Sequence, residues 1–574
     1  MAAAPPLHRP EPAGFTAPVR AGDVLHLWQK PRDPAAASRV TLHDAGGTAV
    51  ALVGPPSDDF QMTTHVVATT GHLAVAWDAE DTAVSVAYAY DPATVLDEGV
   101  RLLWTVPPAA PETTRFRLHL APPFGWMNDP NGMITAAGRT HAFYQHYPNA
   151  LRWDTMHWGH AVSANLVDWT HLPVFLHPRP ALLADPSAQG GAFSGSAIPL
   201  PGGGLRIFHT DREDSREPLE WQMTATSPDL LAAGPSAMLI DGHPPLPGFG
   251  DDLRDPYVFM GPDGLWKMVL AGKDDTAALI LLYETDDPDA AAGWRFVGPL
   301  HREPLPRSVP AECPCVLPLD GAGAGLHVLI FGLIGHHGLV LGRRNPSFAL
   351  VGRFDGRGFE EIARRELDFV GDCYAFQGFV HDGRPVGMAW AANWADVRRT
   401  EDFPSAMTFV RRLVWQDGAL LMPPAEAVTA LRVAPLAATL HDGVDLPGGL
   451  AEIAFDTRAP FRLTLVHADG VLVLVHDGAS LELLDDRSRR GRPVPNRAET
   501  GPLSDIRVFV DVGLVEIYAD GGRWCGTYRL DSDAPVTAVR LDADAASITN
   551  AEIWQLRPQH GAPRREGTAW PSSN

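Results

Sequence analysis

The chain has few cysteines and no long apolar run. Its four cysteines have the spacing of neither a disulfide framework nor a zinc site, and they lie at positions 313, 315, 373 and 525. No window reaches the roughly 18 apolar residues that a membrane-spanning helix needs. The sequence therefore predicts reduced, buried thiols, and it excludes both a helical membrane protein and a disulfide-stabilised scaffold.

Basic residues are also scarce relative to acidic ones. The chain has 46 Lys and Arg against 69 Asp and Glu, which gives a formal net charge of −23. Such an excess of negative charge repels nucleic-acid phosphates and anionic lipids. We therefore expect no nucleic-acid partner and no membrane partner, whereas a neutral small molecule is indifferent to this charge.

The first residues carry no recognisable export signal. Residues 1–6 lack the basic segment followed by an apolar segment that marks a secretory leader. Together with the unpaired cysteines, this indicates a cytoplasmic protein, which meets small, imported solutes. A secreted protein whose signal had been removed would look the same.

Helical periodicity is nearly absent. Short apolar runs, such as 142–144, 206–208 and 328–331, alternate with clusters of Gly, Pro and Asp. This pattern is typical of an all-β protein with many short strands. The length of 574 residues exceeds one core and suggests about three or four domains. No repeat of fixed period is visible, so self-similarity alone does not identify a propeller.

The most informative segment, 125–132, reads Gly-Trp-Met-Asn-Asp-Pro-Asn-Gly. Pro130 disfavours helical backbone at Asp129, and Asn131-Gly132 favours a tight turn because both residues tolerate positive φ. Two interpretations follow. Asp129 is either a carboxylate held at the end of a strand to act on a ligand, or the cap of its own hairpin turn.

Two later segments repeat the theme of a carboxylate in a restricted setting. Asp255 stands between Arg254, which can hold a ligand or a neighbouring acid, and a proline. Glu312 lies among apolar residues, and desolvation there would raise its pKa, as a general acid requires. Taken singly, an Arg-Asp pair is usually a surface ion pair, and an isolated Glu indicates nothing.

In this order and spacing, the three acidic segments resemble glycoside hydrolase family 32, which contains invertases, inulinases and levanases. Further matching blocks support the resemblance over roughly residues 116–560; they lie at 143–145 with Trp153, 157–163, 193–196, 372–375 with Trp390, and 508–516. The resemblance implies a five-bladed β-propeller followed by a β-sandwich. Its catalytic carboxylates would come from different blades and meet at one mouth of the central channel.

We therefore predict an all-β chain: an additional N-terminal β domain, a propeller catalytic domain, a short helical linker and a C-terminal β-sandwich, at residues 1–110, 111–424, 425–435 and 436–574. Strand-like runs such as 24–27, 73–77 and 84–88 fill the first of these domains. This domain could bind sugar, support a homo-oligomer or provide structural cover, and we favour the last two. The oligomeric state stays open.

The resemblance also implies roles for the acids. Asp129 would be the nucleophile, Glu312 the acid and then the base, and Asp255 the group that holds ring hydroxyls and stabilises the transition state. Retaining glycosidases place two carboxyl groups about 5–5.5 Å apart. Mutual repulsion would raise the pKa of Glu312, and Arg254 would offset part of it. The implied reaction is hydrolysis of terminal β-D-fructofuranosides, such as sucrose and short fructooligosaccharides, through a covalent fructosyl-enzyme intermediate and without a cofactor.

Substrate-binding candidates supply neutral donors and acceptors, flat apolar faces or a charge near the acids. They are Asn128, Gln145, Ser194, Trp126, Trp153, Phe193, Arg254, Asp372 and Trp390. The aromatic residues could equally pack in a core. His157 and His160 have a spacing that suggests metal ligands, but no acidic partner pattern accompanies them, so we predict no metal.

Two alternatives remain beside the sucrose-cleaving interpretation. One is a polymer-active exo-inulinase or levanase, or a fructosyltransferase. The other is a non-catalytic fructan-binding protein, which the presence of all three acids disfavours. Two departures from the family pattern, Cys315 and Asn165 in place of the usual aspartates, bear on substrate preference rather than on reaction class.

Overall fold

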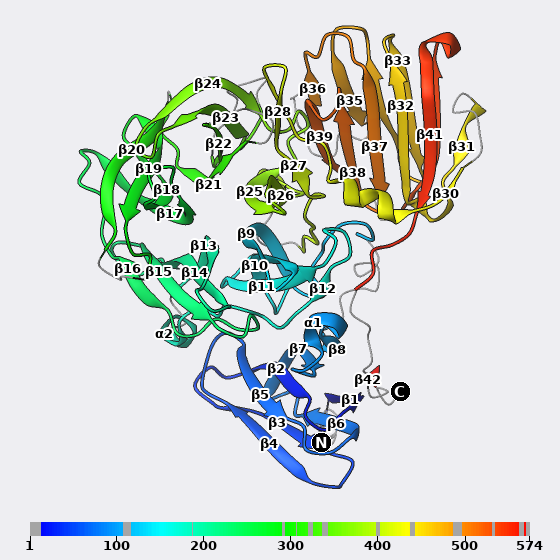
Figure 1. Cartoon of the computed structure of the whole chain (residues 1–574). Coiled ribbons are helices and arrows are strands. Elements are labelled where there is room, and N and C mark those ends of the chain that lie inside the picture. The colour runs from blue at the N-terminus through cyan, green and yellow to red at the C-terminus, as the bar shows by residue number, and fades with distance from the viewer. Residues whose placement is uncertain are drawn as a thin grey trace, which may run out of the picture.

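The computed structural model describes residues 13–106, 116–185, 188–289, 293–305, 307–319, 325–335, 343–397, 402–436, 442–485, 496–530, 534–561 and 568–569. Most of its regular elements are β-strands (Figure 1), so the predicted all-β class is confirmed. They form an N-terminal β domain, a propeller and a C-terminal β-sandwich. Within the described ranges no helix is both long and apolar enough to cross a membrane.

The N-terminal domain consists of two packed sheets. Its strands are β1 (Ala13–Val19), β2 (Val24–Pro31), β3 (Ser38–His43), β4 (Ala49–Gly54), β5 (Gln61–Val66), β6 (Gly71–Trp77), β7 (Thr82–Tyr90) and β8 (Arg101–Thr105), with a short helix α1 (Val95–Glu98) before β8. One sheet has the order β4-β3-β6-β1-β42 and the other β5-β2-β7-β8. Apolar side chains from both sheets, such as Phe15, Leu27 and Val75, form one buried core.

The last described strand returns to this N-terminal domain. β42 (Thr568–Ala569) pairs antiparallel with β1, with Phe15 opposite Ala569. Our assignment of the whole range 436–574 to the sandwich is therefore wrong for this strand. The edge of β1 offers unpaired backbone groups, and a returning segment can pair with them. The predicted boundary at 110 lies outside the described residues.

The propeller contains five consecutive antiparallel sheets. Blade 1 has β9 (Trp126–Ala136), β10 (Arg139–Tyr147), β11 (His157–Ser163) and β12 (Thr170–His171); blade 2 has β13 (Gly190–Pro199), β14 (Leu205–Glu213), β15 (Glu220–Ser227) and β16 (Ala237–Ile240), preceded by helix α2 (Pro180–Ala184). Blade 3 has β17 (Phe249–Met260), β18 (Trp266–Asp274), β19 (Ala277–Thr285) and β20 (Arg295–Pro304); blade 4 has β21 (Ala311–Pro318), β22 (Leu326–Leu333), β23 (Ser347–Phe354) and β24 (Phe359–Glu366). Blade 5 has β25 (Tyr374–His381), β26 (Arg384–Trp390) and β27 (Arg411–Arg412), and a separate hairpin of β28 (Val414–Gln416) and β29 (Ala419–Leu421) follows it.

The first strand of each blade lines the centre of the ring. β9 contacts β13, β13 contacts β17, β17 contacts β21, β21 contacts β25, and β25 closes the ring on β9. Figure 1 shows the five blades around these strands. Because all five strands face the same central channel, side chains at corresponding ends of different blades come together.

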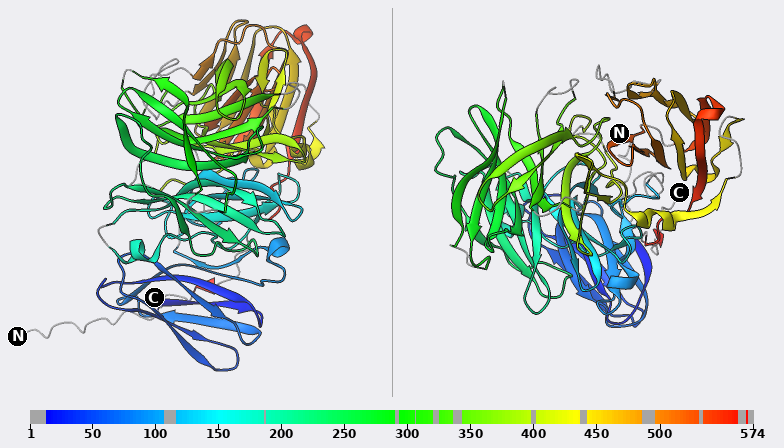
Figure 2. Two further views of the ribbon diagram at one scale, coloured as in Figure 1. Left: turned by 60° about the vertical axis from the view of Figure 1, so that its left-hand side comes forward. Right: turned by 45° about the horizontal axis from the view of Figure 1, so that its top comes forward.

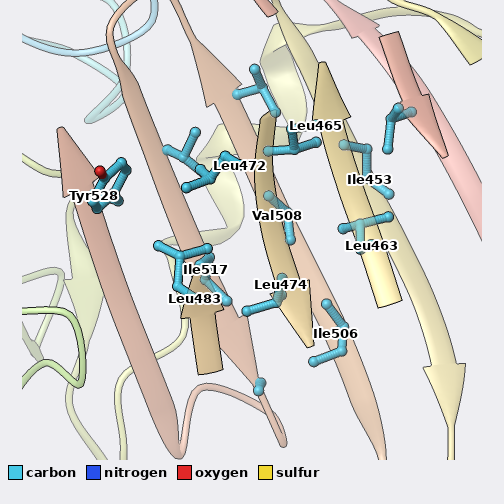
Figure 3. Close-up of a cluster of buried hydrophobic side chains, with 14 of the residues drawn as sticks. Ile453, Leu463, Leu465, Leu472, Leu474, Leu483, Ile506, Val508, Ile517 and Tyr528 are labelled. Atoms are coloured by element: carbon cyan, nitrogen blue, oxygen red, sulfur yellow. The ribbon is translucent and has the colours of Figure 1, made fainter. Parts of the chain in front are cut away.

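The predicted linker is a short 3-10 helix, η2 (Glu426–Leu431), and β30 (Arg432–Pro435) already belongs to the sandwich. One sheet has the order β30-β41-β32-β37-β38-β39 and the other β31-β40-β33-β34-β35-β36. Their strands are β31 (Val444–Asp445), β32 (Ala451–Thr457), β33 (Phe461–His467), β34 (Gly470–His476), β35 (Leu481–Asp485), β36 (Asn496–Ala498), β37 (Asp505–Asp511), β38 (Leu514–Ala519), β39 (Trp524–Arg529), β40 (Val536–Ala543) and β41 (Ile548–Leu556), with short 3-10 turns η4 (Pro447–Gly449) and η5 (Ala545–Ser547). Figure 3 shows aliphatic side chains of the two sheets facing one another, among them Ile453, Val508, Leu463 and Leu474.

The sandwich and the N-terminal domain contact different sides of the propeller (Figure 2). The propeller–sandwich boundary contains a buried ionic network. The two ring nitrogens of His119 lie 2.7 Å from Asp511 Oδ2 and 3.0 Å from Glu516 Oε1, and Arg411 Nη2 donates to Glu516 Oε2 at 2.7 Å. At the boundary between the propeller and the N-terminal domain, the Tyr147 hydroxyl donates to Asp59 Oδ1 at 2.8 Å.

Candidate active site

The three predicted catalytic acids come from three blades and line one cavity. Asp129 lies on β9, Asp255 on β17 and Glu312 on β21. The cavity has a volume of about 380 Å³, within the range of about 300–1,000 Å³ that is typical of small-molecule sites. Its other described lining residues are Asn128, Gln145, Trp153, Phe193, Ser194, Arg212, Asp214, Asp252, Arg254, Pro310, Ile334 and Trp394.

An irregular backbone turns the acids toward the cavity. The pairing register of each first strand shifts near this end, as it does on either side of Asp255 and of Cys313. Asp255, Cys313 and Ala375 have φ of 63°, 51° and 53°, which is uncommon for residues other than glycine. Bulges of this kind redirect a side chain at the rim of a sheet. Corresponding irregularities occur in β9, β13 and β25.

The predicted tight turn at Asn131-Gly132 is wrong. β9 runs without interruption from Trp126 to Ala136, and the hairpin turn is Ala137-Gly138, with φ of 48° and 75°. Two central residues with positive φ are characteristic of a two-residue hairpin turn. Gly132 also has positive φ, 52°, but it serves the strand irregularity beside Asp129. Tolerance of positive φ supports a bulge as well as a turn, and the sequence pattern does not separate them.

Asp129 is held by three donors. Asn128 Nδ2 donates to its Oδ1 at 2.8 Å, while Ser194 Oγ and Cys313 Sγ donate to its Oδ2 at 2.8 and 3.4 Å. Burial raises the pKa of Asp129, and these hydrogen bonds oppose that shift because they favour the charged form. Trp126 fixes Asn128 in turn, since its Nε1 donates to Asn128 Oδ1 at 2.5 Å.

Glu312 has the environment of a protonated acid. Burial raises its pKa, and the nearby Asp255 and Asp129 raise it further, whereas Arg254 and Tyr374 lower it. Arg254 Nη1 donates to Glu312 Oε1 at 3.1 Å, and the Tyr374 hydroxyl donates to Oε2 at 2.9 Å. The direction predicted from its apolar sequence neighbours is therefore confirmed, with desolvation as the largest cause.

Asp255, the third acid of the cavity, is also buried. Burial raises its pKa; Arg254 opposes the shift and Asp129 adds to it. Its Oδ2 accepts a hydrogen bond from the Cys313 backbone N–H at 2.8 Å, and its own N–H donates to Thr210 Oγ1 at 2.9 Å. These bonds fix the carboxylate although its backbone conformation is unusual.

Arg254 connects the acids to a larger charged network that the sequence interpretation missed. Its Nε donates to Glu220 Oε1 at 2.8 Å, its Nη2 pairs with Asp252, and Arg212 Nη1 donates to the same Glu220 oxygen at 2.8 Å. Arg212 also donates to Asp214 at 2.9 Å. Asp252 could have been predicted, because residues two apart in a strand, such as Asp252 and Arg254, point to the same face. The sequence around Arg212 and Asp214 contains no pattern that indicates their place at the site.

Six of the predicted substrate-binding residues line the cavity: Asn128, Gln145, Trp153, Phe193, Ser194 and Arg254. Three do not. Trp126 and Trp390 are almost fully buried behind the wall, and Trp390 Nε1 donates to Ser405 Oγ at 3.0 Å. The indole at the wall is Trp394, stacked on Trp126 with ring centroids 5.8 Å apart.

Asp372 is the third residue outside the cavity. It is fully buried, and its Oδ2 accepts a hydrogen bond from the backbone N–H of Arg529 in the sandwich at 2.9 Å. A carboxylate in this sequence block could serve either a ligand or the domain boundary, and its geometry fits the boundary.

His157 and His160 occupy one strand three residues apart, so their side chains point to opposite faces. His157 Nδ1 lies 3.0 Å from Thr155 O, and His160 Nε2 lies 3.0 Å from His141 Nδ1. In the part of the chain that the structure describes, no group of three or more His, Cys, Asp or Glu is arranged to hold a metal ion.

Comparison with known proteins gives two family matches. The model of the Glycosyl hydrolases family 32 N-terminal domain matches residues 119–424, and that of the family 32 C-terminal domain matches residues 437–555. Among curated relatives, the chain is 30% identical to a sucrose-6-phosphate hydrolase of Escherichia coli, over 76% of this chain and 94% of that protein. It is also 30% identical to a levanase of Bacillus subtilis, over 72% of this chain and 65% of that protein.

Among solved structures, a glycoside hydrolase family 32 protein of Bifidobacterium adolescentis matches with a TM-score of 0.84 and 24% identity. The match covers 95% of this chain and 99% of the other chain. Coverage that large includes the N-terminal β domain, so the two proteins share the fold of all three parts.

Proposed function

The chain belongs to glycoside hydrolase family 32 and hydrolyses fructosides, and from this premise we propose that it is a retaining β-fructofuranosidase acting on sucrose and short fructooligosaccharides. One observation carries the proposal. Asp129, Asp255 and Glu312 converge from three blades on a single cavity, and only Glu312 has an environment that combines a raised pKa with donors from Arg254 and Tyr374.

Asp129 attacks the anomeric carbon of the fructosyl unit and forms an ester. The donors Asn128, Ser194 and Cys313 support this role because they stabilise a carboxylate that must be charged before the attack. The same donors hold the carboxyl group in place while its charge is lost on formation of the ester and restored on hydrolysis.

Glu312 donates a proton to the departing oxygen and then removes one from the water that cleaves the ester. Its raised pKa keeps it protonated near neutral pH, which the first step requires. Once the leaving group has gone, Arg254 stabilises the carboxylate that the second step uses. Asp255 accepts hydrogen bonds from ring hydroxyls and supports the positive charge that develops at the anomeric centre.

The charge of the cavity favours an unphosphorylated substrate. Five described lining residues are acidic, namely Asp129, Asp214, Asp252, Asp255 and Glu312, and only two are basic. Arg212 and Arg254 are both already paired with carboxylates. A phosphate ester would therefore meet repulsion and no unpaired cation among these residues.

Product analysis on sucrose, sucrose 6-phosphate, 1-kestose, inulin and levan tests the proposal. We expect release of fructose, with sucrose and kestose preferred over the polymers and over the phosphorylated sugar. Cleavage of none of the five would contradict the fructosidase assignment, and preference for sucrose 6-phosphate would contradict the charge argument alone.

The polymer-active alternative is favoured by the levanase relative. It predicts early accumulation of mid-length oligosaccharides or faster turnover of levan or inulin than of sucrose in the same assay. A cavity of about 380 Å³ supports removal of one terminal residue at a time rather than binding of a chain interior.

We also propose a cytoplasmic location, which the four free cysteines support. A homo-oligomer formed through the N-terminal domain stays a hypothesis, and light scattering of the purified chain would test it.

A further inference from the structure

A second cavity lies where blade 4, the β28–β29 hairpin and the sandwich meet (Figure 1). Its volume is about 210 Å³, and none of its lining residues lines the acidic cavity. Its walls contain two indoles, three guanidinium groups and small or aliphatic side chains: Trp415, Trp524, Arg364, Arg365, Arg523, Ala349, Val351, Ala363 and Leu420.

Arg365 is a partly buried cation that forms no close ion pair with a carboxylate among the described residues. Its Nε donates to the Glu366 carbonyl at 3.1 Å and its Nη1 to the Leu420 carbonyl at 2.8 Å. Burial lowers its pKa, and the neighbouring Arg411 and Arg523 act in the same direction, whereas Cys525 and Asp368 oppose the shift. The adjacent Arg364 differs, because Glu303 and Glu361 both neutralise it. Asp368 and Glu366 act on Arg365 only through longer-range charge and form no ion pair with it, so its desolvation is only partly offset and the site favours a ligand that supplies a closer negative charge.

Trp524 provides a second unsatisfied donor at the same cavity. Its Nε1 is buried and has no hydrogen-bond partner in the part of the chain that the structure describes. Arg523 adds a further cation, and its Nη1 lies 3.9 Å from Asp520 Oδ2. The polar groups of this cavity whose hydrogen-bonding capacity is not fully used are therefore donors. A matching ligand must be an acceptor with negative charge.

We infer that this cavity binds a small oxyanion, a carboxylate or phosphate group, whose oxygens accept hydrogen bonds from both Arg365 and Trp524 Nε1. The N–H groups of Arg365 that do not donate to the Glu366 and Leu420 carbonyls would form charge-assisted hydrogen bonds to such oxygens. The indole faces of Trp415 and Trp524 would cover an apolar or flat body attached to the anion. The volume lies below that of sites for larger ligands, which limits the occupant to a few heavy atoms beyond the anionic group.

The inferred site spans elements of different domains, since Arg365 lies on β24 and Trp524 on β39. A bound anion would join the propeller to the sandwich and stabilise the folded chain in proportion to its occupancy. This inference is independent of the fructosidase assignment, because its first readout is binding rather than sugar hydrolysis.

Thermal unfolding of the full chain in sodium phosphate, sodium benzoate and sodium chloride at equal ionic strength tests the inference. Phosphate probes the anion alone, and benzoate probes a carboxylate on a flat body. We expect a saturable rise in Tm with at least one of the two oxyanions beyond the effect of chloride. Equal Tm curves in all three salts would overturn the inference.

Three variants locate the effect. Arg365→Gln should weaken the apparent affinity for the anion by about tenfold or more, because a charge-assisted bond is lost. Trp524→Phe, which keeps a ring but removes the N–H, should weaken it by a smaller factor. Arg353→Gln is the control, because Arg353 lies exposed on β23 outside the cavity.

A cooperative thermal transition without added anion reports whether each variant is folded, and this readout does not depend on the fructosidase assignment. Full retention of the Tm rise in folded Arg365→Gln would overturn the inference. If Arg365→Gln does not fold, an unchanged affinity in Trp524→Phe, measured by titration of the intrinsic fluorescence, would overturn it instead.

Discussion

At the scale of single residues, the site separates three carboxylates by their partners. Asp129 accepts from neutral donors, Asp255 from a backbone N–H, and Glu312 from a guanidinium and a phenol. Desolvation raises all three pKa values, so the partners decide which group stays charged. This distinction is the physical basis for the separate roles of nucleophile, stabiliser and acid that we propose for them.

Asp129→Asn should reduce sucrose turnover by several orders of magnitude and leave the thermal unfolding midpoint nearly unchanged. The amide has the same shape but cannot form the fructosyl ester. Turnover within tenfold of the parent enzyme would remove Asp129 from the nucleophile role.

Glu312→Ala should abolish sucrose hydrolysis but still allow fructosyl transfer to the enzyme from a fructoside with a good leaving group, since that step no longer needs the proton. Stopped-flow measurement should show a burst of leaving group, and azide should restore turnover of the activated substrate. Absence of both burst and rescue would contradict the acid/base assignment.

Tyr374→Phe should move the alkaline limb of the pH profile of kcat/KM to higher pH. The Tyr374 hydroxyl favours the charged form of Glu312 and so lowers its pKa; without it the acid keeps its proton to higher pH. Tyr257→Phe is the matched control, because that hydroxyl donates to the Gly378 carbonyl at 3.0 Å rather than to an acid. An unchanged limb in Tyr374→Phe, or an equal shift in the control, would contradict this effect.

At the scale of elements, the strands were predictable and their irregularities were not. Alternating and apolar runs located strands such as β7, β22 and β33 because burial follows residue type. The bulges that aim Asp255 and Glu312 depend on pairing between strands, which no local pattern records. For the same reason, the sequence predicted a turn at Asn131-Gly132 where the structure has a strand irregularity. Arg212 and Asp214 were missed because they reach the site from a neighbouring strand and loop.

Two glycines test whether the irregularity in β9 serves the site. A Cβ at Gly132 would lie 2.9 Å from the Phe143 ring, whereas one at Gly138 would meet nothing within 4 Å, although both residues have positive φ. Gly138→Ala should cost about 1–2 kcal/mol in stability, the strain of left-handed backbone. Gly132→Ala should cost more and should also reduce kcat, because it displaces the strand beside Asp129. Equal effects of the two substitutions on Tm and kcat would contradict this.

At the scale of the whole molecule, buried histidines link stability to pH in both directions. Burial lowers the pKa of His26, His146 and His157 to about 3 each, so they remain neutral in the folded chain. Their unfolded pKa is about 6.5. The stability they contribute is therefore present above pH 6.5 and is lost as pH falls toward 3, since the unfolded chain binds more protons.

His119 acts in the opposite direction at the propeller–sandwich boundary. Burial alone would lower its pKa, but hydrogen bonds and charges from Asp511 and Glu516 raise it to about 9. A folded pKa above the unfolded value of about 6.5 gives stability that is complete below pH 6.5 and is lost as pH rises through 9. The full contribution is roughly 3 kcal/mol, from about 1.4 kcal/mol for each pKa unit.

We therefore expect Tm to fall between pH 7 and pH 10, and His119→Gln to flatten this alkaline decline while lowering Tm at pH 7. Gln keeps one donor nitrogen but carries no charge at any pH, so Asp511 and Glu516 lose the partner whose charge depends on protonation. His301→Gln is the control, because His301 pairs with Glu303 on blade 3, away from this boundary. Calorimetric scans of the three proteins at matched ionic strength give the comparison. An alkaline decline of the same slope in His119→Gln would show that other groups set the upper pH limit.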